Sequence, residues 1–175
     1  MLAAFPFVIK GFHSDNGSEY INKHVCKLLT KLQIELTKSR SRHSNDNALA
    51  ESKNASIVRK QFGYQHIAQK WAPLMNEFNL KYLYPYINYH RPCFFPEIVT
   101  DNKGKQRKTY AYKNMMTPYE KLKSLPKAKA YLKPDFHFEI LDEQVMKMTD
   151  NACAELLQKE RNKLFNQIFE QNKRA

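Results

Sequence analysis

Two carboxylates at defined places in the first third of the sequence constrain the fold most. The apolar run at residues 5–9 predicts a strand buried on both faces, and the polar segment that follows places Asp15 at its end. Glu51 comes after a gap of 35 residues, within the first turns of a predicted helix. A fold that brings this strand end against this helix sets two hard oxygen ligands side by side, which suits Mg²⁺.

The segments around these two acids predict regular elements. Ser18 is a plausible N-cap for a helix over residues 19–31, and residues 33–37 alternate as in a short strand. A second helix begins at Asn45 or Asp46, continues to about Phe62 and is ended by Gly63. Ala55, Val58 and Phe62 form its expected apolar face, and Glu51 lies at the rim of that face. Two simpler explanations stay open: Asp15 only caps the first helix, or Glu51 is only solvated at the edge of its apolar face.

The second half predicts more helix, one hairpin and one further strand. We expect a helix over residues 72–84 with a bend at Pro85, and a hairpin whose turn uses Gly104. A capping box at Thr117–Pro118–Tyr119–Glu120 opens a short helix. Residues 135–140 alternate as a strand, and an amphipathic helix over residues 150–172 either contacts another subunit or lies on its own domain. The tyrosines at positions 82, 84, 86 and 89 either pack in the core or stack on bases.

The charge balance favours a polyanionic partner. The chain has 175 residues, a formal net charge of +12 and 13% aromatic residues, which indicates a folded protein that binds nucleic acid. A merely solvated basic surface is the alternative. Three widely spaced cysteines lack metal-ligand spacing, and we expect neither a membrane-spanning segment nor a signal peptide. The predicted DNA contacts are Lys38, Arg40, Arg42, Lys53, Arg59, Lys60, Lys103, Lys105, Arg107 and Lys108.

Several motifs, in this order, resemble the integrase core of bacterial insertion-sequence transposases, relatives of retroviral integrases. They are Asp15-Asn16-Gly17-Ser18-Glu19, Ser39-Arg40-Ser41-Arg42, Asn45-Asp46-Asn47, Glu51-Ser52-Lys53-Asn54, residues 58–64 and residues 110–122. The resemblance implies an α/β, ribonuclease-H-like fold and a metal-dependent Asp, Asp, Glu centre that cleaves and joins DNA. Asp15 and Glu51 would be two catalytic ligands of Mg²⁺ or Mn²⁺, and Asn16 and Asn47 would orient the neighbouring loops.

The resemblance also implies an organisation and a cellular setting. We expect a partial catalytic core with a truncated mixed sheet at residues 1–90, a basic hairpin and short helix at 91–126, and a helical C-terminal extension at 127–175. The expected partners are transposon ends, target DNA and further copies of this chain or an intact transposase, in the bacterial cytoplasm at the nucleoid.

One departure from the family pattern concerns the first catalytic Asp. That residue belongs on an earlier strand, yet the 14 residues before Asp15 contain no Asp or Glu. We therefore expect an N-terminally truncated transposase with little activity alone. The alternative is a non-catalytic nucleic-acid-binding or oligomerising remnant, and a nuclease on the same fold is a third possibility.

Overall fold

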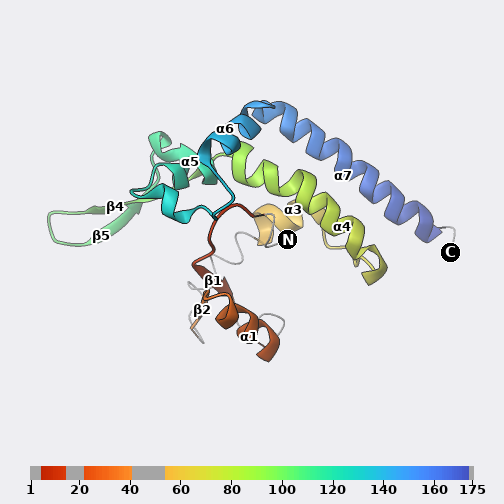
Figure 1. The fold of residues 1–175 in the computed structure, drawn as a ribbon, viewed down its shortest axis with the longest axis horizontal. Coiled ribbons are helices and arrows are strands. Elements are labelled where there is room, and N and C mark those ends of the chain that lie inside the picture. Colours follow the sequence, from red (N-terminus) through yellow and green to blue (C-terminus); the bar gives the residue numbers. More distant parts are fainter. Residues whose placement is uncertain (1–4, 15–21, 41–53, 174–175) are drawn as a thin grey trace. The chain divides into compact units, whose positions relative to one another are not determined.

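A computed structural model describes residues 5–14, 22–40 and 54–173 of the chain, which combine helices with small two-stranded sheets (Figure 1). Backbone contacts divide the chain into two compact units, residues 8–67 and residues 1–7 with 68–175. The mixed α/β class is confirmed, whereas the division into domains at residues 90 and 126 stays a prediction.

A parallel strand–helix–strand motif lies at the start of the 8–67 unit. Its two strands pair in parallel from Gly11 opposite Glu35 to Ser14 opposite Lys38, so the helix between them forms the crossover connection. The Asn22 side chain caps this helix by accepting hydrogen bonds from two backbone amides, at 3.0 Å each. The elements of this unit are β1 (Gly11–Ser14), α1 (Lys23–Lys31), β2 (Glu35–Lys38), η2 (Asn54–Arg59) and α3 (Lys60–Phe62).

Three predictions for this unit need correction. The first strand is not at residues 5–9 but at β1, because Pro6 cannot donate a ladder hydrogen bond and Phe7 is buried in the core of the other unit. Helix α1 begins at Lys23 with Asn22 as its N-cap, while Ser18 lies outside the described residues. The short strand predicted at residues 33–37 is confirmed but begins at Glu35, because Gln33 takes a left-handed conformation (φ 55°) that ends the helix.

The helix predicted to carry Glu51 is described from Asn54 onward. Its end is confirmed, since Gly63 has a positive φ of 70° and closes α3. The predicted apolar face is only partly correct: Phe62 is half-buried, but Ala55 and Val58 are exposed. Residues 54–59 form a π-helix, whose wider turns shift side chains away from the α-helical period used in the prediction.

A long helical run forms the centre of the second unit. Residues 69–90 are helical throughout, and Pro85 has helical backbone angles, so the predicted bend at Pro85 is wrong. The proline is accommodated between two π-helical segments, where the hydrogen-bond pattern is i→i+5. The segments are η3 (Gln69–Trp71), α4 (Ala72–Phe78), η4 (Asn79–Leu83) and η5 (Tyr86–His90).

The rest of this unit packs helices and short strands around that run. The predicted hairpin is confirmed as the antiparallel pair β4–β5, and the capping box at Thr117 is confirmed by both of its hydrogen bonds. Helix α7 is confirmed almost to its predicted ends and contacts α4, η4 and η5 of its own unit (Figure 1). The elements are β3 (Cys93–Phe94), β4 (Glu97–Thr100), β5 (Gln106–Thr109), η6 (Tyr112–Asn114), β6 (Met115–Met116), α5 (Pro118–Lys123), η7 (Ala128–Tyr131), α6 (Phe138–Met146) and α7 (Asp150–Lys173).

The strand predicted at residues 135–140 is wrong, because α6 begins at Phe138. Phe138 and Leu141 are buried with Phe7 and Tyr119 in a hydrophobic cluster, and Tyr89 packs against it. The rings of Tyr89 and Tyr119 meet edge to face with their centroids 5.3 Å apart. Tyr89 therefore packs in the core, which agrees with the first of the two explanations given for the tyrosine run.

Candidate nucleic-acid interface

The parallel pair β1–β2 fixes where the chain reaches the first predicted metal ligand. Strand β1 ends at Ser14, so Asp15 is the first residue after the carboxyl end of a strand. The backbone amide of Ser39, just after β2, donates to the Ser14 carbonyl at 3.1 Å, and both serines are buried. Because the strands are parallel, their carboxyl ends lie side by side, and α/β sheets bind their ligands at the carboxyl ends of the strands.

The second half of the predicted metal site cannot be described in the same way. Asp15, Glu51, Asn16 and Asn47 all lie outside the described residues, as do Arg42 and Lys53. Within the described ranges, the structure has no group of three or more His, Cys, Asp or Glu side chains that could hold a metal ion. The Asp15–Glu51 pair thus stays a prediction that rests on sequence and on the strand end that precedes Asp15.

Four predicted DNA contacts of the 8–67 unit are described, and all four are exposed. Lys38 is the last residue of β2 and Arg40 follows it closely, so these two cations lie at the carboxyl edge of the parallel pair. Arg59 and Lys60 lie where η2 passes into α3. The Arg59 guanidinium lies 5.5 Å from the ring centroid of Tyr64, a cation–π contact that holds it at the helix surface.

The other four predicted contacts lie together on the β4–β5 hairpin, and Asp101 organises its turn. The Asp101 carboxylate accepts hydrogen bonds from the backbone amides of Lys103 (3.0 Å) and Lys105 (2.9 Å). Gly104 has a φ of +76°, a conformation that a residue with a Cβ adopts only with strain. The turn thereby presents Lys103 and Lys105 at the end of an exposed ribbon.

The paired strands carry cations on both faces of this ribbon. Lys108 lies opposite Ile98 and Arg107 lies opposite Val99, and neighbouring pairs point to opposite faces. All eight residues of β4 and β5 are exposed. The two acids of the hairpin are engaged locally, since Asp101 lies 3.9 Å from Arg107 and Glu97 lies 3.4 Å from Lys113.

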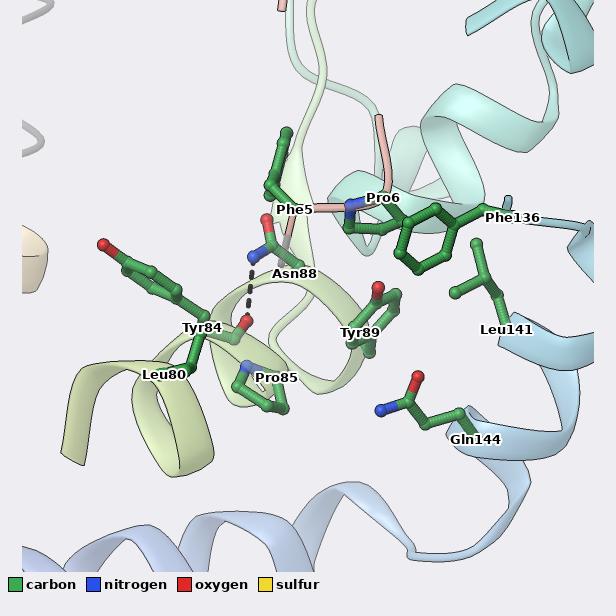
Figure 2. Close-up of a pocket in the computed structure, with 10 residues that line it drawn as sticks. All are labelled: Phe5, Pro6, Leu80, Tyr84, Pro85, Asn88, Tyr89, Phe136, Leu141 and Gln144. Atoms are coloured by element: carbon green, nitrogen blue, oxygen red, sulfur yellow. Dashed lines mark hydrogen bonds between the residues drawn. The ribbon is translucent and has the colours of Figure 1, made fainter. Parts of the chain in front are cut away.

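A separate cavity of about 220 Å³ lies beside η5, and its lining side chains are apolar, aromatic or amide (Figure 2). The Asn88 side-chain amide donates to the Tyr84 carbonyl at 2.8 Å, next to Pro85. Burial raises the pKa of the Tyr89 phenol to about 12, so the phenol is neutral at physiological pH. A cavity with this lining suits neither a divalent ion nor a phosphate, and we assign it no part in the candidate interface.

A polar network that the sequence did not reveal joins α5 to α6. The Lys123 ammonium donates to both Asp142 carboxylate oxygens, at 2.8 and 2.6 Å, and the Tyr119 hydroxyl donates to the same carboxylate at 2.8 Å. The Lys123 and Tyr119 hydrogen bonds hold the pKa of Asp142 below its ordinary value. Burial raises the pKa of the Tyr119 phenol. This network stabilises the fold of its unit and lies away from the basic hairpin in sequence.

Another contact that no sequence pattern predicted joins the long helical run to α7. His90 is buried, and its Nδ1 lies 3.0 Å from an oxygen of Asp150, the first residue of α7. The two residues are 60 positions apart, and a single histidine in an aromatic run carries no signal for such a pair. Cys26, Cys93 and Cys153 are free thiols.

Comparison with known proteins gives one partial likeness. The chain is 35% identical over 92 residues to the uncharacterized protein y4rM of Sinorhizobium fredii (strain NBRC 101917 / NGR234). That alignment covers 51% of this chain and 26% of the relative, so the chain matches about a quarter of the relative's length. No family model matches the sequence, and no solved structure matches it. Of the helices that the structure describes, none has the length and apolarity to cross a membrane.

Proposed function

We propose that this chain carries part of the catalytic centre of a DNA strand-transferring enzyme, similar to the integrase core of bacterial insertion-sequence transposases. The fold that goes with this proposal is ribonuclease-H-like, of which β1, α1 and β2 would be the parallel part. The substrates are transposon ends and target DNA in the bacterial cytoplasm, and further copies of this chain or an intact transposase would complete the assembly.

One observation carries the proposal: the candidate ligand Asp15 directly follows the carboxyl end of a strand in a parallel strand–helix–strand unit. Ligands of open α/β sheets bind at this end of the strands. The exposed cations Lys38, which ends the neighbouring strand, and Arg40, which lies just beyond it, are at the same end of the strand pair, where a phosphate backbone would have to pass. The net charge of +12 supports a nucleic-acid partner independently.

The donor set fits the proposed metal, because Mg²⁺ and Mn²⁺ prefer carboxylate oxygens together with water and substrate phosphate. Asp15 and Glu51 would hold the ion. When bound, such an ion stabilises the charge that develops on a phosphoryl group and activates a water or 3′-hydroxyl. Lys38, Arg40, Arg59 and Lys60 would position the DNA backbone by contacts with its phosphates.

The proposal includes low activity for these 175 residues alone. The resemblance implies three carboxylates, and residues 1–14 contain no Asp or Glu that could be the first. Purified chain incubated with Mg²⁺ or Mn²⁺ and end-sequence DNA should neither cleave nor join it appreciably. Efficient joining by this chain would contradict the assignment of an incomplete centre.

The decisive experiment lengthens the chain upstream and then removes the two candidate ligands. The chain is extended by the translated genomic sequence directly upstream of its first codon, and strand cleavage and joining are measured with Mg²⁺. We expect activity that Asp15→Asn or Glu51→Gln abolishes while DNA affinity is retained. If the extended chain is active and both variants remain active, the assignment of Asp15 and Glu51 is wrong.

The basic hairpin favours a second function in which the carboxylates have no part. A protein with four exposed cations on one ribbon can bind nucleic acid and oligomerise without any metal centre, and so interfere with an intact transposase. In that case Glu51→Gln leaves every biological effect intact. Inhibition of transposition by overproduced wild-type and Glu51→Gln chains to the same extent would support this second function.

A further inference from the structure

Aromatic and aliphatic side chains stand in solvent beside the cations of the β4–β5 hairpin. Tyr112 is 84% exposed, Ile98 64% and Tyr110 59%, although side chains of this size are usually buried at least in part. Tyr110 directly follows β5, and Tyr112 begins η6. A cluster of exposed apolar side chains with a polar rim marks a surface that binds a partner.

The ring of Tyr112 has an aromatic neighbour, Phe94. It meets the ring of Phe94 edge to face, with centroids 5.5 Å apart and an interplanar angle of 71°. Phe94 lies in β3, which pairs with β6 just after η6, so two short strands anchor both rings at the base of the hairpin. Phe94 was not among the residues predicted from sequence to be functional.

The cations around these rings indicate the chemistry of the partner. The β4–β5 hairpin projects from the rest of its unit (Figure 1). It carries Lys103, Lys105, Arg107 and Lys108, and its acids Glu97 and Asp101 are engaged by neighbouring groups. Lysine is depleted at the centre of protein–protein interfaces, whereas cations combined with exposed aromatic rings are typical of surfaces that bind single strands. Lysines on an exposed strand also discourage edge pairing, but that does not explain the two tyrosines outside the paired strands.

We propose that this surface, called the hairpin platform and formed by Tyr110, Tyr112 and the four hairpin cations, binds single-stranded DNA. The faces of paired bases are hidden inside a duplex except at its two ends, so an exposed ring stacks along a strand only where the bases are unpaired. Tyr110 and Tyr112 stack on bases, while the lysines contact the phosphates on either side. This inference rests on the proposed function in taking DNA as the partner, and it adds that unpaired strand ends are bound by the hairpin platform.

The test compares single-stranded with duplex DNA by fluorescence anisotropy on the full 175-residue chain, with EDTA present. The probes are a labelled oligothymidylate of about 12 nucleotides, within the site size of common single-strand binders, and a blunt duplex of the same length. We expect Tyr110→Ser/Tyr112→Ser to weaken single-strand binding by about 5- to 150-fold for each base that no longer stacks on a tyrosine ring. Duplex affinity should change less than about twofold, because the cations are retained.

Two control variants make the outcome specific. Tyr110→Phe/Tyr112→Phe keeps both ring faces and should bind the single strand like the wild type. Met146→Ser removes an apolar side chain of similar exposure (83%) elsewhere in the same unit and should also leave binding unchanged. The proposal is overturned if Tyr110→Ser/Tyr112→Ser binds the single strand normally, if duplex binding falls equally, or if Met146→Ser has the same effect.

The same assay separates this proposal from the metal-dependent function. EDTA removes divalent ions, so single-strand binding that depends on Tyr110 and Tyr112 supports the hairpin platform whether or not Asp15 and Glu51 hold a metal. Conversely, the upstream-extended chain can show metal-dependent cleavage that is abolished in Glu51→Gln but unchanged in Tyr110→Ser/Tyr112→Ser. If the latter variant also binds the single strand normally, only the hairpin platform is overturned.

Discussion

Removing the four cations of the hairpin should change how steeply DNA binding depends on salt. In the variant with Lys103, Lys105, Arg107 and Lys108 all replaced by Gln, we expect fewer phosphate contacts with duplex DNA. Each contact contributes about 0.9 to the slope of log Kobs against log salt concentration. The Arg107 guanidinium lies 3.9 Å from Asp101 and is already partly compensated, whereas the three lysines should contribute fully.

The expected change follows from three to four phosphate contacts. The slope should become shallower by roughly 2.7 to 3.6. When salt is raised from about 50 mM to about 200 mM, the affinity of the wild type should therefore fall about 40- to 150-fold further than that of the variant. All of the replaced side chains are exposed, so the thermal midpoint of unfolding should stay close to that of the wild type.

The assay is a salt titration of anisotropy with labelled duplex DNA. A matched control replaces four other exposed lysines of the same unit, Lys129, Lys147, Lys159 and Lys163, and so removes the same formal charge. If the control lowers the slope as much as the hairpin variant does, binding reflects overall charge rather than the hairpin. An unchanged slope in the hairpin variant would refute the assignment of these residues as phosphate contacts.

Three predictions concern stability. Asp142→Asn should destabilise the chain by roughly 1 kcal/mol at neutral pH, because the charged hydrogen bonds to Lys123 are removed at a half-exposed site. The pKa of Asp142 is lowered in the folded state, so its contribution to stability is present above the ordinary value of 3.8 and disappears as the pH falls through the folded-state pKa. If denaturant titrations give the same difference in unfolding free energy between the wild type and Asp142→Asn at pH 3 as at pH 7, this reasoning is contradicted. Lys127→Gly should raise the free energy of unfolding by about 0.5–1 kcal/mol, because Lys127 has a φ of 60°, a left-handed conformation that glycine adopts without strain. A lower unfolding midpoint in this variant would show that the lysine side chain stabilises the fold by more than its backbone strain destabilises it. Leu141→Ala should cost about 2–5 kcal/mol, since the side chain is 1% exposed in the core, and a decrease below about 1 kcal/mol in chemical denaturation would mean that the core is not packed as described.

Local signals in the sequence predict much of the second unit. The capping box at Thr117, the turn at Gly104 and the apolar spacing of α7 each depend on contacts within a few residues, and each is confirmed. The strand predicted at residues 135–140 is wrong because two periods overlap there. Phe136, Phe138 and Ile140 alternate, but Phe138, Leu141 and Val145 follow the helical spacing that tertiary packing selects.

The predicted first strand shows why burial alone misleads. Residues 5–9 are apolar because Phe5 and Phe7 pack in the core with side chains of α5 and α6, whereas Ser14 is the one buried residue of the strand itself, β1. Pro6 was the available signal against a strand at that place. In the candidate site, charge patterning located the hairpin cations, but the packing of Phe94 on Tyr112 depends on the pairing of β3 with β6, which no local pattern encodes.

The central claim, that Asp15 and Glu51 share one divalent ion, is tested most directly by a double-mutant cycle of Mn²⁺ binding followed by electron paramagnetic resonance. The wild type, Asp15→Asn, Glu51→Gln and the double variant are titrated with duplex DNA present. If both carboxylates hold the same ion, each single variant should lose most of the binding, the double variant should lose little more, and Mg²⁺ should compete with Mn²⁺ in the wild type. Equal Mn²⁺ affinity in all four proteins, or strictly additive losses, would contradict the claim.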